Sequence, residues 1–411
     1  MRIDGCLKAV PKGASHERHR RITHIGPDSR FLAFASEVFE SVAPGANEYI
    51  VVSDSGKKPL RFPIQHGPVR VAATSMRGIA GVSFMVRNSD MIIAHSMTPH
   101  GAIAFGCSRP ETVRVWSGWG FDYYGSDESP DAGLLGASTL ALSTSLDDAV
   151  DRRLPIRALS DRFLRETRRR LLHHAAGRAD YFSAPIPDDL SVFTRRFPEF
   201  DGSYSQISYG NVAETFACDT RLAGTNILVG NSATPSNNHL EIFDCLARLD
   251  LSGRRIIVPL SYGDLAYRDA IVSRGCELFG SAFTPLIDFL PQHEYAAITA
   301  SCNIVVMNHK RQQALGNIGA GLYQGAHVFL DEACPTVDFL RSRGAFLYTT
   351  NQLKLEGLPK APLSLEVVAS NRGVLEALWG AEQVVRYAEA LVSRLDRLRP
   401  LQASGPGVSE Q

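Results

Sequence analysis

The chain has 411 residues, more than a single hydrophobic core usually holds, so we expect two domains of ordinary size. Hydrophobic residues make up 44% of it and charged residues 21%, which is typical of globular proteins and argues against disordered and fibrous classes. The 43 Lys and Arg balance the 43 Asp and Glu. This balance argues against nucleic acid as a partner, because binding many phosphates needs a concentrated basic surface.

The seven cysteines are odd in number and scattered, without the paired spacing of zinc sites. We therefore expect reduced thiols, no metal site and no cofactor. Residues 1–20 lack the apolar core of a signal peptide, and no apolar run is long enough to cross a bilayer. We expect a cytoplasmic protein that begins with a disordered arm over residues 1–20.

Residues 21–205 predict an N-terminal Rossmann-like domain. A short strand at 21–25 leads through a Gly-Pro turn into a helix over 31–39. Further strands are predicted from apolar runs at 48–52, 91–95 and 112–116. Continuous apolar strands of this kind are typical of a parallel sheet that is covered on both faces.

A polar linker at 206–224 precedes a second series, which predicts a C-terminal Rossmann-like domain over 225–375. Its strands are predicted at 226–230, 254–259, 303–307 and 327–330, and its helices at 238–249, 264–274, 291–301 and 316–325. The alternation indicates an α/β fold with two doubly wound parallel sheets that face an interdomain cleft. We expect residues 376–411 to form a C-terminal helix and tail. The helical stretch predicted at 364–396 is long enough to pack back across that cleft.

The strongest local signal is the loop that follows the strand at 226–230. It is rich in Gly, Asn and Ser and leads into a helix, an arrangement that exposes backbone N–H groups to an anion. The residues we assign to a bound donor here are Gly230, Asn231 and Ser232. The loop matches neither the P-loop nor GxGxxG, which argues against ATP hydrolysis and nicotinamide binding. An ordinary helix N-cap explains the same residues equally well.

A second polar loop follows the strand at 303–307 and opens the next helix. Two cations, two amides and a glycine-rich helix start suit a pyrophosphate and a sugar. The donor-binding residues predicted here are Lys310, Arg311, Gln312, Gln313, Gly316 and Asn317. The alternative is that Gly316, Gly319 and Gly321 only allow close packing of the helix on the sheet.

In the N-terminal half, polar and aromatic residues follow the strands at 21–25 and 112–116. Aromatic faces bind sugar rings, and a carboxylate or imidazole can take the proton of a sugar hydroxyl. We predict catalytic roles for Asp122, as first choice, Asp28 and His24. We predict acceptor binding by Trp119, Tyr123 and Tyr124.

Structural roles compete with these assignments. Trp116 is better explained as a core residue, and Asp28 taken alone as the cap of a turn. His95, at the end of an apolar strand, fits a buried histidine with satisfied hydrogen bonds better than a base. Residues 157–178 predict a basic amphipathic helix that either docks on an anionic membrane surface or acidic partner, or packs on its own domain with a solvated arginine face.

The two C-terminal motifs carry a family resemblance. The segments 227–232 and 258–263, and the run 311–313 followed by 316–318, resemble glycosyltransferase family 56, with Tyr262 as a further donor residue. His24-x-Gly26-x-Asp28 and Trp119-Gly120-x-Asp122-x-Tyr124 are similar more weakly, so that the resemblance spans about residues 21–350. The arm, the stretch 125–150 and the linker are not matched.

The resemblance implies a GT-B fold and a TDP-linked or related donor. The known member of the family transfers 4-acetamido-4,6-dideoxygalactose from its TDP-sugar to a lipid-linked disaccharide of enterobacterial common antigen. We therefore expect a glycosyltransferase that acts on a glycan or lipid-linked saccharide, peripherally on the inner face of the membrane. The chain has no Asp-x-Asp motif, which favours metal-independent transfer. The alternatives are a two-domain nucleotide-sugar epimerase and a non-catalytic sugar-binding module, the latter disfavoured by the missing export signal.

Overall fold

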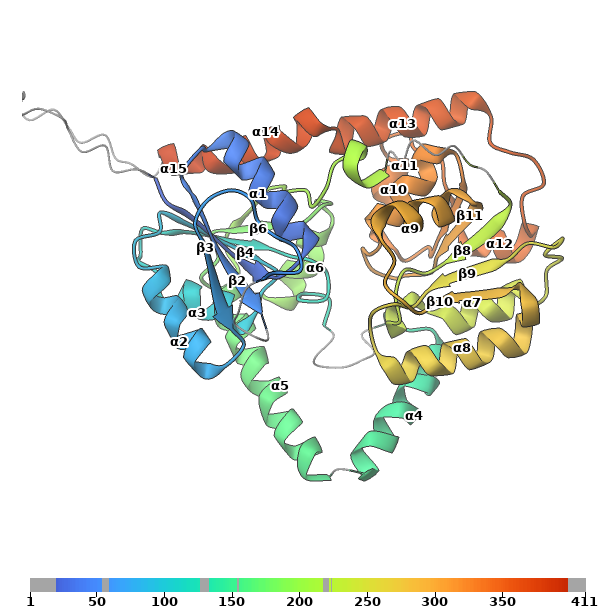
Figure 1. The fold of residues 1–411 in the computed structure, drawn as a ribbon, viewed down its shortest axis with the longest axis horizontal. Coiled ribbons are helices and arrows are strands. Elements are labelled where there is room, and N and C mark those ends of the chain that lie inside the picture. Colours follow the sequence, from blue (N-terminus) through green and yellow to red (C-terminus); the bar gives the residue numbers. More distant parts are fainter. Residues whose placement is uncertain are drawn as a thin grey trace, which may run out of the picture.

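The computed structural model describes residues 20–397 except 54–58, 126–132, 154, 217–221 and 223. Almost all of the expected arm and the tail beyond Arg397 lie outside these residues. The described chain forms two α/β domains side by side, each built on a parallel sheet (Figure 1). The predicted α/β fold with two parallel sheets is therefore confirmed.

The first sheet has seven parallel strands in the order β3-β2-β1-β4-β5-β6-β7. Its strands are β1 (Ile22–Pro27), β2 (Asn47–Ser53), β3 (Val69–Ala73), β4 (Met91–His95), β5 (Val113–Ser117), β6 (Tyr181–Ser183) and β7 (Ser203–Tyr204). The helices of this part of the chain are α1 (Arg30–Val42), α2 (Met76–Met85), α3 (Pro99–Cys107), α4 (Ala137–Arg153), α5 (Pro155–Ala176) and α6 (Asp189–Arg196).

The second sheet has six parallel strands in the order β10-β9-β8-β11-β12-β13. Its strands are β8 (Asn226–Val229), β9 (Ile256–Pro259), β10 (Phe283–Leu286), β11 (Cys302–Met307), β12 (His327–Leu330) and β13 (Tyr348–Thr349). The associated helices are the π-helix η1 (Val212–Phe216), the 3-10 helices η2 (Pro235–Asn237) and η3 (Gly280–Ala282), α7 (His239–Leu246), α8 (Leu265–Phe279), α9 (Gln292–Ala300), α10 (Leu315–Gln324), α11 (Pro335–Arg341) and α12 (Thr350–Glu356).

The strand order reverses in the middle of each sheet. Helices leave in opposite directions from β1 and β4 in the first sheet, and from β8 and β11 in the second. Side-chain-lined crevices form outside the carboxyl ends of strands at such switch points. The two loops predicted to bind a donor follow β8 and β11, the two strands at the switch point of the second sheet.

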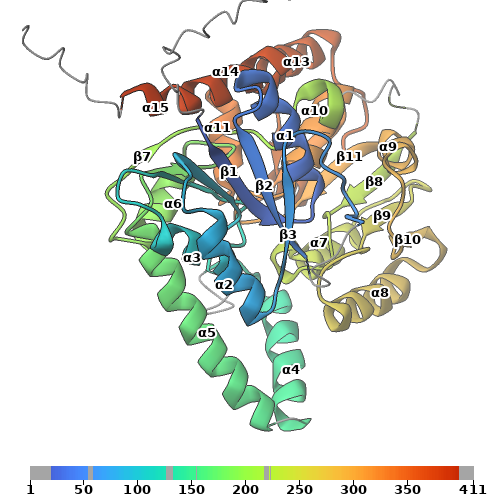
Figure 2. The same cartoon turned by 60° about the vertical axis from the view of Figure 1, so that its left-hand side comes forward.

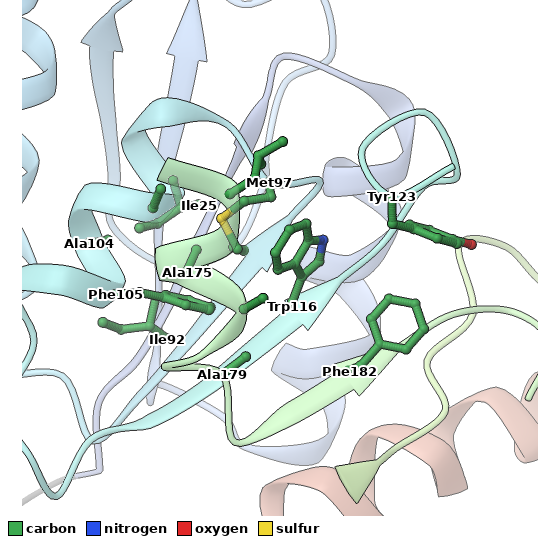
Figure 3. Close-up of a cluster of buried hydrophobic side chains, with 14 of the residues drawn as sticks. Ile25, Ile92, Met97, Ala104, Phe105, Trp116, Tyr123, Ala175, Ala179 and Phe182 are labelled. Atoms are coloured by element: carbon green, nitrogen blue, oxygen red, sulfur yellow. The ribbon is translucent and has the colours of Figure 1, made fainter. Parts of the chain in front are cut away.

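The core of the first domain packs α3 and α5 against one face of the sheet. Figure 3 shows Trp116 among Phe105, Ala175 and Phe182, all of which are fully buried. The interpretation of Trp116 as a core residue is therefore confirmed.

The C-terminal helices join the two domains. The stretch predicted as one helix is interrupted at Gly380, whose extended backbone separates α13 (Leu365–Trp379) from α14 (Ala381–Val392) and the short α15 (Arg394–Arg397). In α13, Leu375 packs into the core of the second domain. In α14, Leu391 packs with Phe39 in the core of the first domain. Figure 1 shows α13 lying over the second domain and α14 over the first.

Helices α4 and α5 make a second connection, which the sequence did not predict. We expected residues 21–205 to fold as one N-terminal unit, but α4 packs against α7 and α8 of the other domain, whereas α5 returns to pack against α3. Figures 1 and 2 show the two helices as a projecting hairpin with one leg under each domain.

Polar contacts fix the first turn of α4 on the second domain. The carboxylate of Glu241, on α7, accepts hydrogen bonds from the backbone N–H of Thr139 at 2.9 Å and from its hydroxyl at 2.6 Å. Asn238 accepts from Gly136 N–H at 2.8 Å and donates to the carbonyl of Leu134 at 2.9 Å. Glu241 of the second domain therefore caps α4, a helix that follows strands of the first domain in the sequence.

Removing this cap is expected to loosen α4. The substitution Glu241→Ala leaves the Thr139 N–H without its acceptor and should lower the free energy of unfolding by about 1 kcal/mol. Urea unfolding measures this change, and limited proteolysis should show faster cleavage within α4. The control is Glu277→Ala, which removes an exposed carboxylate paired with Arg274. Equal unfolding midpoints for E241A and the wild type would contradict the prediction.

Candidate functional site

The loops after β8 and β11 are tied together at the switch point of the second sheet. Gln313 donates to Asn231 Oδ1 at 2.8 Å and accepts from the Ser236 hydroxyl at 2.8 Å. His309 Nε2 lies 2.8 Å from Asn237 Oδ1. The loops after β8 and β11, which were predicted as two separate motifs, thus form one hydrogen-bonded unit.

The side chain of Asn237 shapes the first of these loops from within. Its Oδ1 accepts from Asn231 N–H at 2.9 Å, and its amide donates to the carbonyls of Ser232 and Thr234 at 3.0 Å. Gly230 has a φ of 67°, and a Cβ there would lie 2.6 Å from His239 Nε2, so only glycine fits. The N-cap of α7, Asn238, makes no side-chain capping bond, so the ordinary N-cap reading does not describe this loop.

Helix α10 begins abruptly after the second loop. Its N-cap is Ala314, which has a left-handed φ of 58° and no side chain that could accept from the first-turn N–H groups. Gly316 and Asn317 lie in this first turn, and Asn317 Oδ1 accepts from the Tyr295 hydroxyl at 3.2 Å. Gly321 lies farther along the helix, where a Cβ would come within 3.0 Å of Val305 and Val328. The packing interpretation is therefore correct for Gly321.

Arg311 lies where the two domains meet. A Cβ added to Gly120 of the first domain would lie 2.8 Å from its guanidinium, which donates to the Ser236 hydroxyl of the second domain at 3.4 Å. Among the described residues, no carboxylate lies within 4.0 Å of this half-buried guanidinium. Burial lowers the pKa of Arg311, which means that the protein environment leaves this cation under-compensated.

The other predicted donor residues divide into two groups. Tyr262, whose side chain is 54% exposed, accepts from the Asn231 amide at 2.9 Å and so extends the loop surface. Lys310 instead donates to the carbonyl of Leu135, just before α4, at 3.2 Å. The buried Gln312 donates its N–H to the Tyr124 hydroxyl of the first domain at 3.4 Å.

Asp122 is enclosed by hydrogen-bond donors. One carboxylate oxygen accepts from Met97 N–H at 2.9 Å and from Trp116 Nε1 at 2.8 Å, and the other accepts from Trp119 N–H at 2.8 Å. Burial raises the pKa of the carboxyl group against the effect of these bonds. This placement favours a role in holding the loop after β5 over the proton transfer that we expected of Asp122.

Tyr123 and Tyr124 lie in the interior and present no open ring face to an acceptor. Their hydroxyls donate to Asp189 at 2.7 and 2.5 Å, because a buried phenol needs a partner (Figure 3 shows Tyr123). Burial raises the pKa of Asp189 to about 6. Asp189 was not predicted as a site residue, because the only local sign of its role is its position at the start of α6.

Trp119 belongs instead to a group of three aromatic side chains. Its ring lies 5.2 Å from that of Phe31 and 5.8 Å from that of Tyr209, and the last two rings are 5.6 Å apart. A cavity of about 250 Å³ lies beside this group. It is lined by Arg30, Ala33, Phe34 and Glu37 of α1, by Phe62, Pro63 and Tyr209, and by Glu214 and Gln292 from the side of the second domain. Phe31 and Tyr209 lie in no sequence motif, so the sequence alone did not predict their place in this group.

The remaining predicted catalytic residues have structural partners. His24 is fully buried, between His95 at 3.0 Å and Asn47 at 3.2 Å. The half-buried Asp28 accepts from Arg61 N–H at 2.7 Å and from Phe62 N–H at 2.9 Å, and thereby holds one wall of the cavity.

The basic helix predicted at 157–178 forms most of α5. Arg169 and Arg170 both pair with Glu166, and the side chains before Leu164 lie outside the described residues. Within the described ranges, no helix combines the length and apolar character that a membrane span requires. The same ranges contain no cluster of three or more His, Cys, Asp or Glu placed to hold a metal ion.

A known protein family matches the C-terminal part of the chain. The model of this family, described as 4-alpha-L-fucosyltransferase, glycosyl transferase group 56, matches residues 188–373, which include both loops predicted to bind a donor. The resemblance to family 56 is therefore confirmed, although the match does not extend to the N-terminal motifs.

Solved glycosyltransferase structures share the fold. Sucrose-phosphate synthase from Thermosynechococcus elongatus superposes with a TM-score of 0.66 at 11% identity, over 92% of this chain and all of that one. Anabaena Alr3699/HepE in complex with UDP-glucose gives 0.54 at 13% identity, over 92% and 96% of the two chains. The lipopolysaccharide galactosyltransferase WaaB gives 0.55 at 10% identity, over 91% and 99%. The chain is a glycosyltransferase with the GT-B fold.

The buried histidines predict that acid destabilises the protein. Burial lowers the pKa of His24 to about 4 and that of His239 to about 3, and it holds the pKa of His95 and His309 well below 6.5. These groups stay neutral in the folded chain but take up protons below about pH 6.5 once the chain is unfolded. Acidification therefore favours the unfolded state.

Between pH 7.5 and 5.5 each of the four histidines should remove up to about 1 kcal/mol of stability. Asp189 and Asp122 have the opposite sign, because a raised pKa lets the folded state bind a proton first, and they offset part of the loss. Urea unfolding at the two pH values should show a net loss of about 2 kcal/mol or more. A midpoint that stays constant or rises at pH 5.5 would contradict this prediction.

Proposed function

We propose that this glycosyltransferase transfers a sugar from a nucleotide-diphosphate sugar, TDP-linked as in the family it resembles, to a hydroxyl group of a saccharide acceptor. The observation that carries the proposal is the half-buried Arg311, which has no carboxylate partner among the described residues and faces the junction of the domains. A desolvated cation of this kind is stabilised by an anion, and a diphosphate supplies one.

The surroundings of Arg311 fit the same ligand. The loop after β8 contributes Ser236, whose hydroxyl lies 3.4 Å from the Arg311 guanidinium, and α10 directs its uncapped first turn toward the same switch point. The N–H groups and the positive end of a helix N-terminus favour phosphate. HepE, which shares the fold, was solved with UDP-glucose, which supports a nucleotide sugar as the donor class.

The chemistry required of the donor side is stabilisation of the leaving group. As the sugar departs, negative charge grows on the nucleoside diphosphate, and fixed donors around it lower the barrier without reorganising. Arg311 and the first turn of α10 supply such donors, assisted by the Asn231 and Tyr262 surface. We further propose that these groups suffice without a metal ion.

The acceptor side is assigned to the first domain. The rings of Phe31, Trp119 and Tyr209 and the adjacent cavity offer aromatic faces beside charged groups, a combination that suits a saccharide. By this proposal residues 21–205 bind the acceptor and residues 225–375 the donor, joined by 206–224 and by the C-terminal segment 376–411. The family resemblance supports a lipid-linked acceptor, with α5 as the segment that approaches an anionic membrane surface.

Binding of nucleotides tests the donor assignment. In a thermal-shift series with TDP, UDP and GDP, at least one nucleotide should raise the melting temperature, because it binds only the folded chain. Arg311→Gln keeps hydrogen-bonding capacity but removes the charge, and it should weaken that nucleotide by about 10- to 100-fold, the worth of one or two charged hydrogen bonds.

Arg343→Gln is the matched control, since Arg343 lies two residues beyond the end of α11 and contacts Phe339 rather than the loops. Nucleotide affinity that is equal in R311Q, R343Q and the wild type would refute the proposed donor site. A response to free monosaccharides with none to any nucleotide would favour a sugar-binding module.

Metal independence has its own test. Release of nucleoside diphosphate from the preferred nucleotide sugar should proceed at the same rate with and without about 5 mM EDTA, which removes weakly held divalent ions. Restoration of a lost rate by Mg²⁺ or Mn²⁺ would show that the cationic groups named above do not suffice.

A further inference from the structure

Two histidines bridge the switch point of the first sheet. His24 lies on β1 and His95 is the last residue of β4, the two adjacent strands between which the strand order reverses. Both side chains are fully buried, and His24 Nδ1 lies 3.0 Å from His95 Nε2. The pair therefore lies on the two strands of the first sheet that correspond to β8 and β11 of the second.

Asn47 determines where the protons of this pair lie. Its amide nitrogen donates to the carbonyls of Phe39 and Ala43 at 3.1 and 2.8 Å and to Glu40 at 2.9 Å, so its Oδ1 must be the atom that faces His24. An amide oxygen only accepts, which places a proton on His24 Nε2, 3.2 Å away. Since burial keeps His24 neutral, its Nδ1 carries a lone pair and accepts from His95.

The same argument assigns the proton of His95. Its Nε2 donates to His24, so its Nδ1 carries a lone pair, and that buried atom has no hydrogen-bond partner in the described part of the chain. An unused acceptor in the interior costs about 1–3 kcal/mol unless something else occupies it.

Other unused polar atoms lie on the same edge of the sheet. The parallel register puts His95 next to Ser117 and Ser117 next to Ser183, so the three side chains form a row on one face at the carboxyl ends of β4, β5 and β6. The Ser183 hydroxyl and Trp119 Nε1 are also buried without a partner among the described residues. This row of polar atoms adjoins the aromatic group, because the Ser117 hydroxyl lies 2.9 Å from that of Tyr209. Such a cluster at the carboxyl ends of the strands indicates a place for ligand hydroxyl groups.

We infer that His95 is the catalytic base of the transfer, and that His24 and Asn47 position it. The inference rests on the proposed function. The acceptor oxygen forms a bond to the anomeric carbon while its proton passes to His95 Nδ1. The bond from the anomeric carbon to the phosphate oxygen breaks, and its electron pair leaves with the nucleoside diphosphate. A single displacement of this kind inverts the anomeric configuration.

The other candidate bases on this wall are already engaged. Both oxygens of Asp122 accept hydrogen bonds, and both nitrogens of His24 have partners. His95 itself is fully buried, with Gly26 of β1 packed so closely that a Cβ there would lie 3.0 Å from His95 Cβ. Access for a hydroxyl therefore requires movement of the backbone at the end of β1, of the kind that substrate binding brings about in many enzymes.

Replacing His95 by glutamine or by asparagine tests its two ring nitrogens separately. His95→Gln keeps an N–H for His24 and loses the Nδ1 lone pair, whereas His95→Asn keeps an acceptor near Nδ1 that takes up no proton. With the nucleotide sugar that binds best, both variants should release nucleoside diphosphate at least about 100-fold more slowly than the wild type. Their affinity for the nucleotide alone should stay within about twofold, because the donor loops are untouched.

His173→Gln is the control, since His173 lies on α5 and pairs with Glu199. Full turnover by H95Q, or recovery of turnover in H95N, would overturn the role of His95 as a base. Failure of the wild type to bind any nucleotide would instead refute the proposed function, and the two results are distinguishable.

A second measurement holds even if the variants do not fold. In the wild type labelled with ¹⁵N-histidine, long-range ¹H–¹⁵N spectra should show His95 as the neutral tautomer protonated on Nε2. A proton on Nδ1 would overturn the inference, because that nitrogen would then have no lone pair to offer.

Discussion

The position of the site depends on the reversal of strand order in each sheet. At β1 and β4 in one domain, and at β8 and β11 in the other, neighbouring chains leave in opposite directions and open the space above the sheet. Left-handed non-glycine residues follow three of these four strands, namely Ser96 after β4, Asn238 after β8 and Ala314 after β11. Such conformations persist only where the surrounding structure imposes them, so the strain of the backbone is concentrated where ligands are expected to bind.

The two domains are held together by more than the segment that links their sheets. Helix α14 returns to the core of the first domain, and α4 crosses to the second, where Glu241 caps it and Lys310 holds the carbonyl of Leu135. Asn238 contacts both the segment before α4 and the loop after β11. The loops after β8 and β11 are therefore in direct contact with a hairpin that also packs on the first domain.

Periodicity predicted the strands that lie in the middle of the two sheets and the helices that follow them, because buried parallel strands are continuous apolar runs. It missed the short strands β3, β6, β7, β10 and β13, most of which lie toward the edges where apolar runs are short. The donor loops could be predicted because each is a local motif. Asp189, Phe31, Tyr209 and the capping by Glu241 could not, because each depends on residues far apart in the sequence. His95 shows the same limit, since its unused nitrogen is defined only by His24 and Asn47.

The two walls of the proposed site differ in character. Among the described residues, Arg311 on the donor side has no carboxylate within 4.0 Å, and His95 Nδ1 on the acceptor side is a buried lone pair with no hydrogen-bond donor. Glycosyl transfer needs both, because negative charge develops on the leaving diphosphate while a proton is lost from the attacking hydroxyl. If Arg311 and His95 exchanged positions, a neutral imidazole would lie beside the phosphates. A guanidinium, which has no lone pair to accept a proton, would lie beside the hydroxyl that must lose one. Under the proposed assignment, these two groups place the donor in the second domain and the acceptor in the first.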